Sequence, residues 1–201
     1  MKPRDYVLAQ IHHEQTRPIP FTLDFEPVVG ERLDQHYGGP QWRDRLTPYL
    51  VRFSVVDNVL WEPIDDVYVR DAYGGVWRMD RRPWHHERGP LSEPTLEGYT
   101  YPPAEKFINP GPRAEMFGYK PPLTREEALQ KCEEYKDSFL VAHVGWGIWE
   151  TAWQMRGFEN ALMDAVAEPD FFAAMLDQHT EMALAYVDYA ASLPVDAIMF
   201  G

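Results

Sequence analysis

The sequence predicts an α/β protein in which the strands of a parallel sheet alternate with helices. Residues 139–144 are nearly all apolar and include β-branched side chains, which is typical of a strand buried on both faces. Apolar side chains recur at helical spacing between residues 170 and 190, and Pro194 ends this pattern. A second apolar run, residues 195–200, follows at once. Because strands that alternate with helices form βαβ units, these observations favour a parallel sheet with right-handed connections.

The composition argues against several classes of protein. The chain has 201 residues, enough for one domain with a sizeable core, and a formal net charge of −13. Such acidity argues against nucleic acid as a partner, because phosphates require a basic surface. Cys132 is the only cysteine, so neither an internal disulfide nor a CxxC metal site is possible. No apolar run approaches the roughly 18 residues of a membrane span, and the first residues lack a signal pattern, so we expect a cytoplasmic protein without a membrane partner.

The first third of the chain is predicted to form a helix, a short strand and two further helices, at residues 2–12, 19–25, 28–37 and 42–60. Asp24 and Glu26 stand at the end of the predicted strand. Gly38 is expected to end the second helix, and Pro48 interrupts the third.

Residues 65–122 differ in character from the rest of the chain. Apolar and polar residues alternate on both sides of Gly74–Gly75, which predicts a β-hairpin over residues 65–79. Asp71 is expected to shape its turn. Residues 81–122 are rich in proline and glycine and show no periodicity, which is typical of a lid or of a long excursion over the surface.

The C-terminal part begins with a capping box, because Thr124 precedes Glu127 by three residues and a helix is expected to run to about Tyr135. After the strand at residues 139–144, two glycines bracket a tryptophan, and a short aromatic helix follows up to Gly157. Asp170 is expected to cap the long helix that comes next.

Three residues are candidates for catalysis. His143 stands near the end of its predicted strand, where it could act as an acid, a base or a ligand donor. Its alternative interpretation is a core histidine held by one hydrogen bond. Asp24 and Glu26 at the end of the first predicted strand are candidate acid–base groups, although one of the two is expected to point away, since neighbours on a strand alternate.

Four residues are candidates for binding a small-molecule substrate. Trp146 and Trp153 could form flat apolar walls, whereas their alternative role is packing. Gly145 and Gly147 allow close backbone approach at a helix N-terminus, which an anion could use, and a simple tight turn explains them equally well.

Three further histidines are assigned other roles. His85 and His86 could reach over the site, but adjacent residues on a strand rarely bind one metal ion. His179 lies on the apolar stripe of the long helix and is expected to be structural.

The number of strands leaves two architectures open. A complete (β/α)8 barrel needs about 250 residues, and this chain contains three or four predicted core strands. The alternatives are a partial barrel and a small open sheet. In the partial barrel, the last strand presents an unpaired apolar edge.

Five segments carry a resemblance to the uroporphyrinogen decarboxylase (URO-D) superfamily: RDYVLAQIHHEQTRPIP (4–20), DAYGGVW (71–77), GPLSEPTLEGYTYP (89–102), GIWETAWQMRGFENALMDAVAEPDF (147–171) and VDAIMFG (195–201). They follow one another in the order that this family shows. The resemblance implies the N-terminal portion of a (β/α)8 TIM barrel, folded as a single domain over residues 1–201, with residues 65–122 as a hairpin and irregular excursion.

Two departures favour the methyltransferase-like branch of that family over true decarboxylation. Residues 21–29 contain Asp24 and Glu26 where decarboxylases carry arginines for a polyanionic substrate, and Trp153 aligns with their active-site tyrosine. The resemblance then implies methyl transfer between a small substrate and a corrinoid on a partner protein. It also implies that residues of the C-terminal half bind zinc. No metal ligand is therefore expected in this chain, and residues 1–201 alone are expected to be inactive. The alternatives are a tetrapyrrole decarboxylase without a cofactor and a non-catalytic partial barrel that binds a partner or forms a homo-oligomer.

Overall fold

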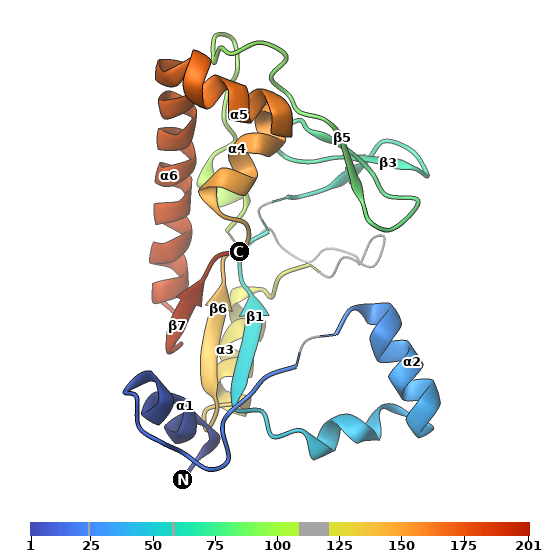
Figure 1. Cartoon of the computed structure of the whole chain (residues 1–201), viewed down its shortest axis with the longest axis vertical. Coiled ribbons are helices and arrows are strands. Elements are labelled where there is room, and N and C mark those ends of the chain that lie inside the picture. Colours follow the sequence, from blue (N-terminus) through green and yellow to red (C-terminus); the bar gives the residue numbers. More distant parts are fainter. Residues whose placement is uncertain (24, 58, 109–120) are drawn as a thin grey trace.

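The computed structural model describes residues 1–23, 25–57, 59–108 and 121–201 and has a mixed α/β architecture. A three-stranded sheet has the order β1-β6-β7, and a four-stranded sheet has the order β2-β3-β4-β5 (Figure 1). The first sheet is parallel and the second is antiparallel. The predicted α/β class is therefore confirmed, and within the described ranges the parallel sheet does not close into a barrel.

The parallel sheet aligns the carboxyl ends of its three strands. It consists of β1 (Leu50–Ser54), β6 (Phe139–His143) and β7 (Ala197–Met199). In the register of the sheet, Ser54 pairs with His143 and His143 pairs with Met199. Parallel strands need long crossover connections, and here helices and the antiparallel sheet supply them. The strands predicted at residues 139–144 and 195–200 are confirmed.

The strand predicted at residues 19–25 is wrong for every described residue of that segment, which forms neither helix nor strand. Ile19 and Leu23 are exposed. A strand is stable when its backbone groups pair with a neighbour, but here a pocket of about 330 Å³ lies between β1 and the residues Phe21, Thr22, Leu23 and Phe25. The described residues of the segment therefore do not pair with the edge of β1.

The helix predicted over residues 42–60 is also wrong. A short 3-10 helix, η1 (Pro40–Arg45), is followed by β1. Pro48 cannot continue a helix, and the residues after it alternate Val51 and Phe53 with polar side chains. β-Branched and aromatic residues in alternation favour a strand, and the edge of β6 completes its hydrogen bonding.

Three helices belong to the half of the molecule that holds the parallel sheet. α1 (Pro3–Ile11) contacts β1 and β6, and α2 (Pro27–Tyr37) packs against η1. Gly38 ends α2 with φ of +74°, as predicted, because glycine adopts this left-handed conformation without strain. α3 (Arg125–Glu134) begins with the predicted capping box of Thr124 and Glu127.

Three further helices form the upper part of the molecule in Figure 1. α4 (Ile148–Arg156) packs against α5 (Phe158–Ala167) and α6 (Pro169–Ala191), and α6 also contacts β7. The cap predicted at Asp170 is wrong, because α6 begins at Pro169 and Glu168 holds the N-cap position. Asp170 lies instead in the first turn, where its negative charge interacts favourably with the positive end of the helix dipole. Along the described parts of the chain, no helix is long and apolar enough to cross a membrane.

The antiparallel sheet confirms and extends the predicted hairpin. It comprises β2 (Glu62–Pro63), β3 (Tyr68–Arg70), β4 (Val76–Arg78) and β5 (His85–Arg88), and a second 3-10 helix, η2 (Ala104–Lys106), follows. Buried Asp71 shapes the turn as expected. Its carboxylate accepts hydrogen bonds from the backbone of Tyr73 (3.0 Å) and Gly75 (2.8 Å) and from Trp77 Nε1 (2.8 Å).

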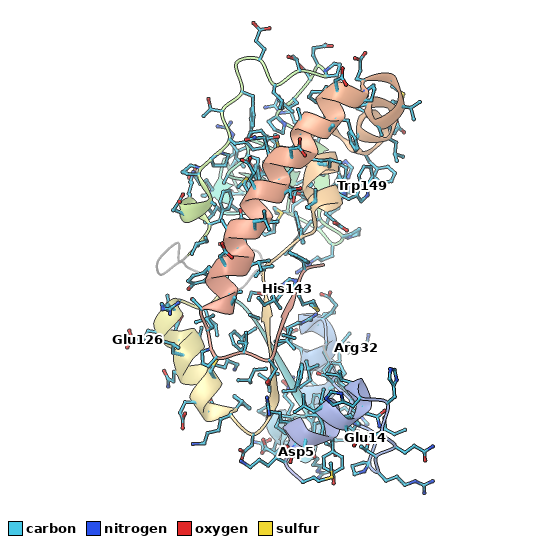
Figure 2. All side chains as sticks on the ribbon, turned by 90° about the vertical axis from the view of Figure 1, so that its left-hand side faces the viewer. Asp5, Glu14, Arg32, Glu126, His143 and Trp149 are labelled. Carbon is cyan, nitrogen blue, oxygen red and sulfur yellow. The ribbon has the colours of Figure 1, made fainter. Side chains whose placement is uncertain are left out.

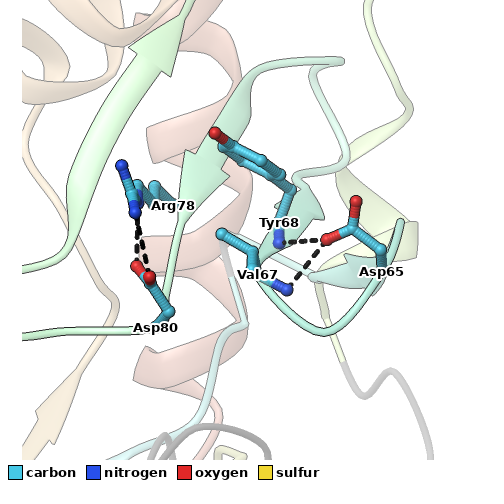
Figure 3. A network of polar contacts seen from close by, with 5 residues as sticks. All are labelled: Asp65, Val67, Tyr68, Arg78 and Asp80. Carbon is cyan, nitrogen blue, oxygen red and sulfur yellow. Dashed lines mark hydrogen bonds and ion pairs between the residues drawn. The ribbon is translucent and has the colours of Figure 1, made fainter.

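Two exposed polar contacts lie at the ends of the two middle strands of this sheet (Figure 3). The Asp65 carboxylate accepts hydrogen bonds from the backbone amides of Val67 and Tyr68, both at 2.8 Å. Arg78 binds both oxygens of Asp80, at 2.8 and 3.0 Å. These contacts fix the turn before β3 and the end of β4.

Candidate functional site

The carboxyl ends of the parallel strands form the strand-end site, which we define as Ser54, His143, Gly145, Gly147 and Gly201. His143 Nδ1 lies 3.3 Å from Ser54 Oγ, and both side chains are half-buried. Figure 2 shows His143 at mid-height in the molecule. In parallel α/β folds, functional groups gather at this edge of the sheet, so the position of His143 is the one expected for a functional residue.

The surroundings of His143 favour its neutral form. Burial lowers the pKa of the imidazole, and the charge of Arg52 lowers it further. A neutral imidazole carries one proton and one lone pair. When the Ser54 hydroxyl donates to Nδ1, the proton of the ring lies on Nε2, and the ring can donate at that atom.

The two glycines allow close packing at the end of β6. Gly145 has φ of +89°, a conformation that strains other residues, and its carbonyl accepts a hydrogen bond from the Gly201 amide at 2.9 Å. A Cβ atom on Gly147 would lie 2.8 Å from the Gly201 carbonyl and 2.5 Å from Glu150 Oε2. Because Glu150 places a carboxylate in the first turn of α4, an anion at this helix N-terminus is disfavoured.

The predicted substrate-binding tryptophans belong to a different group, the tryptophan cluster of Trp61, Trp77, Trp84, Trp146 and Trp153. Trp77 lies in its middle, with ring centroids 5.6 Å from Trp146 and 6.4 Å from Trp153. Trp61 packs against Trp77 at 6.5 Å and against Trp84 at 5.0 Å. The structure therefore packs the rings of Trp146 and Trp153 against Trp77 of the antiparallel sheet.

The predicted acidic candidates are not brought to the strand-end site. Asp24 lies outside the described residues. Glu26 occupies the N-cap position of α2, where its backbone carbonyl accepts hydrogen bonds from the amides of Val29 and Gly30. Its side chain is exposed, and Figure 1 shows α2 well apart from the carboxyl end of β6. The physical reason is the missing strand at residues 19–25, which was expected to carry both carboxylates to that edge.

Two residues at these sites were not predicted. Ser54 escaped notice because β1 was interpreted as part of a helix, although the alternation of Val51, Phe53 and Val55 was a signal for a strand. His86 was considered only as a lid residue. It pairs with Trp77 across β4 and β5, and the two ring centroids lie 4.7 Å apart.

His86 is held firmly in the tryptophan cluster. Its ring lies 5.6 Å from that of Trp153 and forms a hydrogen bond with the backbone carbonyl of Gln154. Burial lowers the pKa of His86 despite this hydrogen bond. Its Nε2 atom is buried and has no hydrogen-bond partner among the described residues.

The described residues do not assemble a metal site. Nowhere among them do three or more His, Cys, Asp or Glu side chains approach closely enough to hold one ion. The zinc that the family resemblance implies therefore has no ligand set in this part of the structure.

The comparisons with known proteins add no relative. No family model, curated protein or solved structure matches this chain. The resemblance to the URO-D superfamily thus depends on the five segments quoted above and on the order of strands and helices, and what it implies for function is a proposal.

Proposed function

We propose that this chain is the N-terminal part of a URO-D-type (β/α)8 barrel and serves methyl transfer between a small substrate and a corrinoid on a partner protein. One observation carries the proposal: Ser54, His143 and Met199 lie in register at the carboxyl ends of three parallel strands. This is the edge at which barrel enzymes place their reacting groups. The other strands of such a barrel would add to the outer edges of β1 and β7.

His143 is suited to the acid–base part of this reaction. When a substrate gives up a methyl group, the heteroatom that held it keeps the bonding electron pair and needs a proton or a hydrogen bond. Neutral His143, held at Nδ1 by Ser54, donates a hydrogen bond from Nε2 to that heteroatom and so stabilises its developing charge, and the proton itself comes from solvent. The corrinoid would supply the acceptor for the methyl group. We derive no step through zinc, because the described residues do not assemble its ligands.

The test uses the complete barrel of which residues 1–201 are proposed to be the N-terminal part, because these residues alone are expected to be inactive. It measures methyl transfer to free cob(I)alamin from methanol, methylamine and methanethiol, followed as loss of the cob(I)alamin absorption band. Loss of the band with one donor is the expected result. Since loss of one preorganised hydrogen-bond donor to developing charge costs about 100-fold or more, His143→Asn should reduce the rate by about that factor. His12→Asn changes an exposed histidine at the C-terminal end of α1 and should leave the rate unchanged.

The alternatives give different results in the same preparation. Release of carbon dioxide from uroporphyrinogen, without methylation of cobalamin, would replace the proposal with a decarboxylase. Absence of both reactions would favour the non-catalytic partial barrel. Equal rates for His143→Asn and the unmodified protein would remove His143 from the mechanism.

A further inference from the structure

A second cavity, the β5–α5 pocket, lies between β5 and the junction of α4 with α5. Its volume is about 670 Å³, within the range of about 300 to 1,000 Å³ that is usual for small-molecule sites. The residues that matter for its chemistry are Trp77, Trp84, His86, Arg88, Trp153 and Phe158. None of them belongs to the strand-end site.

The two walls of the pocket are held together by backbone contacts. The Leu91 amide donates to the Met155 carbonyl at 3.0 Å, which joins the chain after β5 to the end of α4. A Cβ atom on Gly89 would lie only 2.2 Å from the same carbonyl, so glycine is required for this approach. The pocket is therefore built into the contact between the antiparallel sheet and the helices.

Flat aromatic surfaces line the pocket. Trp77 and Trp153 pack at a tilt of 58°, and the Phe158 ring lies 6.2 Å from that of Trp153. Phe158 is 54% exposed, which leaves much of its ring uncovered. Indole and phenyl faces bind planar rings by stacking or edge contacts, which are worth about 0.5–1.5 kcal/mol beyond burial. The ligand that fits these walls contains an aromatic ring.

The charged groups at the pocket favour a negative group on that ring. Arg88 lines the pocket, is exposed, and has no ion pair among the described residues. Its neighbour Glu87 also lines the pocket, is exposed, and interacts electrostatically with Arg78, which does not line it. Arg156, also in the lining, is buried and bound to Asp164, so that its charge is already balanced. Arg88 is thus the cation available to a ligand.

We propose that the β5–α5 pocket binds an aromatic carboxylate, with its ring against Trp153 and Phe158 and its carboxylate paired with Arg88. Repulsion from Arg88 disfavours a cationic ligand that stacks on these rings, and a purely aliphatic acid would forfeit the ring contacts. This inference does not depend on methyl transfer, because it uses none of the strand-end residues.

Isothermal titration calorimetry of the full chain with three probes tests the ligand class. 2-Naphthoate should bind about tenfold or more tightly than cyclohexanecarboxylate, because one aromatic contact of 1.4 kcal/mol corresponds to that factor. 2-Naphthylmethylamine, with the same ring and a positive charge, should not bind detectably. Equal affinity for the three probes, or no binding of 2-naphthoate, would overturn the proposal.

Two surface variants with matched controls locate the site. Arg88→Gln should weaken 2-naphthoate binding by about tenfold, as expected for loss of a charge-assisted contact, whereas Arg70→Gln on the exposed part of β3 should not change it. Phe158→Ala should weaken binding by a similar factor, and Val166→Ala, an exposed residue of the same helix outside the pocket lining, should not. All four positions are exposed, so the variants should fold.

The same titration separates this proposal from the proposed function. His143→Asn should leave 2-naphthoate binding intact even where it abolishes methyl transfer. If Arg70→Gln weakens binding as much as Arg88→Gln, the ligand is held by general surface charge and the assignment of the pocket is wrong.

Discussion

His179 shows how burial alone can lower the pKa of a single side chain. It is 3% exposed and lies edge-on to Tyr73 and Tyr101, with ring centroids at 5.9 and 5.4 Å. Its Nε2 atom has no hydrogen-bond partner among the described residues. Burial lowers the pKa of His179 to about 4. The structural role predicted for His179 agrees with this position in the core.

The low pKa of His179 predicts acid sensitivity. The unfolded chain takes up a proton near pH 6.5, whereas the folded chain does so only near pH 4, so protonation favours unfolding between these values. The free energy of unfolding should fall by about 3 kcal/mol from pH 7 to pH 4 through this residue.

Urea unfolding at several pH values checks this prediction. Other groups also titrate in this range, so the comparison is with His179→Leu, whose stability should depend less on pH by that amount. His36→Leu is the control, because His36 is exposed. Parallel curves for the unmodified protein and His179→Leu would contradict the prediction.

One buried ion pair connects three elements. Arg156, the last residue of α4, donates from Nε to Asp164 Oδ2 at 2.6 Å and from Nη2 to Asp164 Oδ1 at 3.3 Å. Its Nη1 donates to the Leu91 carbonyl at 2.9 Å. Arg156 therefore holds α5 and the segment after β5 against the end of α4, and it shapes the corner beside the β5–α5 pocket.

Removal of one partner of this pair should be costly. In Asp164→Asn, the guanidinium stays buried with its charge unbalanced, so we expect a loss of about 3–5 kcal/mol in the free energy of unfolding. Glu133→Gln breaks the exposed pair with Lys136 and should cost less than about 1 kcal/mol. Urea denaturation compares the two variants. Equal losses in the free energy of unfolding would show that the buried pair stabilises the protein no more than the exposed pair does.

The two edges of the parallel sheet decide whether the whole molecule associates with other copies of itself. Among the described residues, β1 and β7 each pair with β6 alone. Beside β1, Phe21, Leu23 and Phe25 line the adjoining pocket and are partly exposed. Unpaired strand edges next to apolar side chains promote association.

We therefore predict that this chain associates with itself in a concentration-dependent manner. Phe21→Ser combined with Leu23→Ser should reduce the average mass measured by light scattering after size-exclusion chromatography. Leu184→Ser, at an equally exposed leucine of α6, should not. A monomer at every concentration, or an equal effect of the control, would refute the prediction, whereas a discrete dimer would support the homo-oligomer expected of a partial barrel.

Local signals were enough to predict several elements. The capping box of Thr124, the apolar run of β6, the glycine after α2 and the turn at Asp71 each depend on residues that are close in sequence. The helix α6 follows from its periodicity and the strand β7 from its apolar run. The signals for these features lie in residues that are close in sequence, which is why they could be located without the structure.

The site depended on distant pairing and was predicted less completely. The position of His143 at a strand end followed from its own segment, but its contact with Ser54 spans 89 residues and requires the pairing of β1 with β6. Likewise, Trp153 and His86 meet only because the antiparallel sheet packs against α4.

The sequence by itself determined the α/β class, the order of most elements and the position of His143, because propensity, capping and periodicity act over a few residues. Tertiary structure alone decided that residues 19–23 remain unpaired, that Glu26 lies away from His143, and that Trp146 and Trp153 join the tryptophan cluster. These outcomes depend on which surfaces are available to bury apolar area and to pair backbone groups, and segments far apart in the chain provide those surfaces.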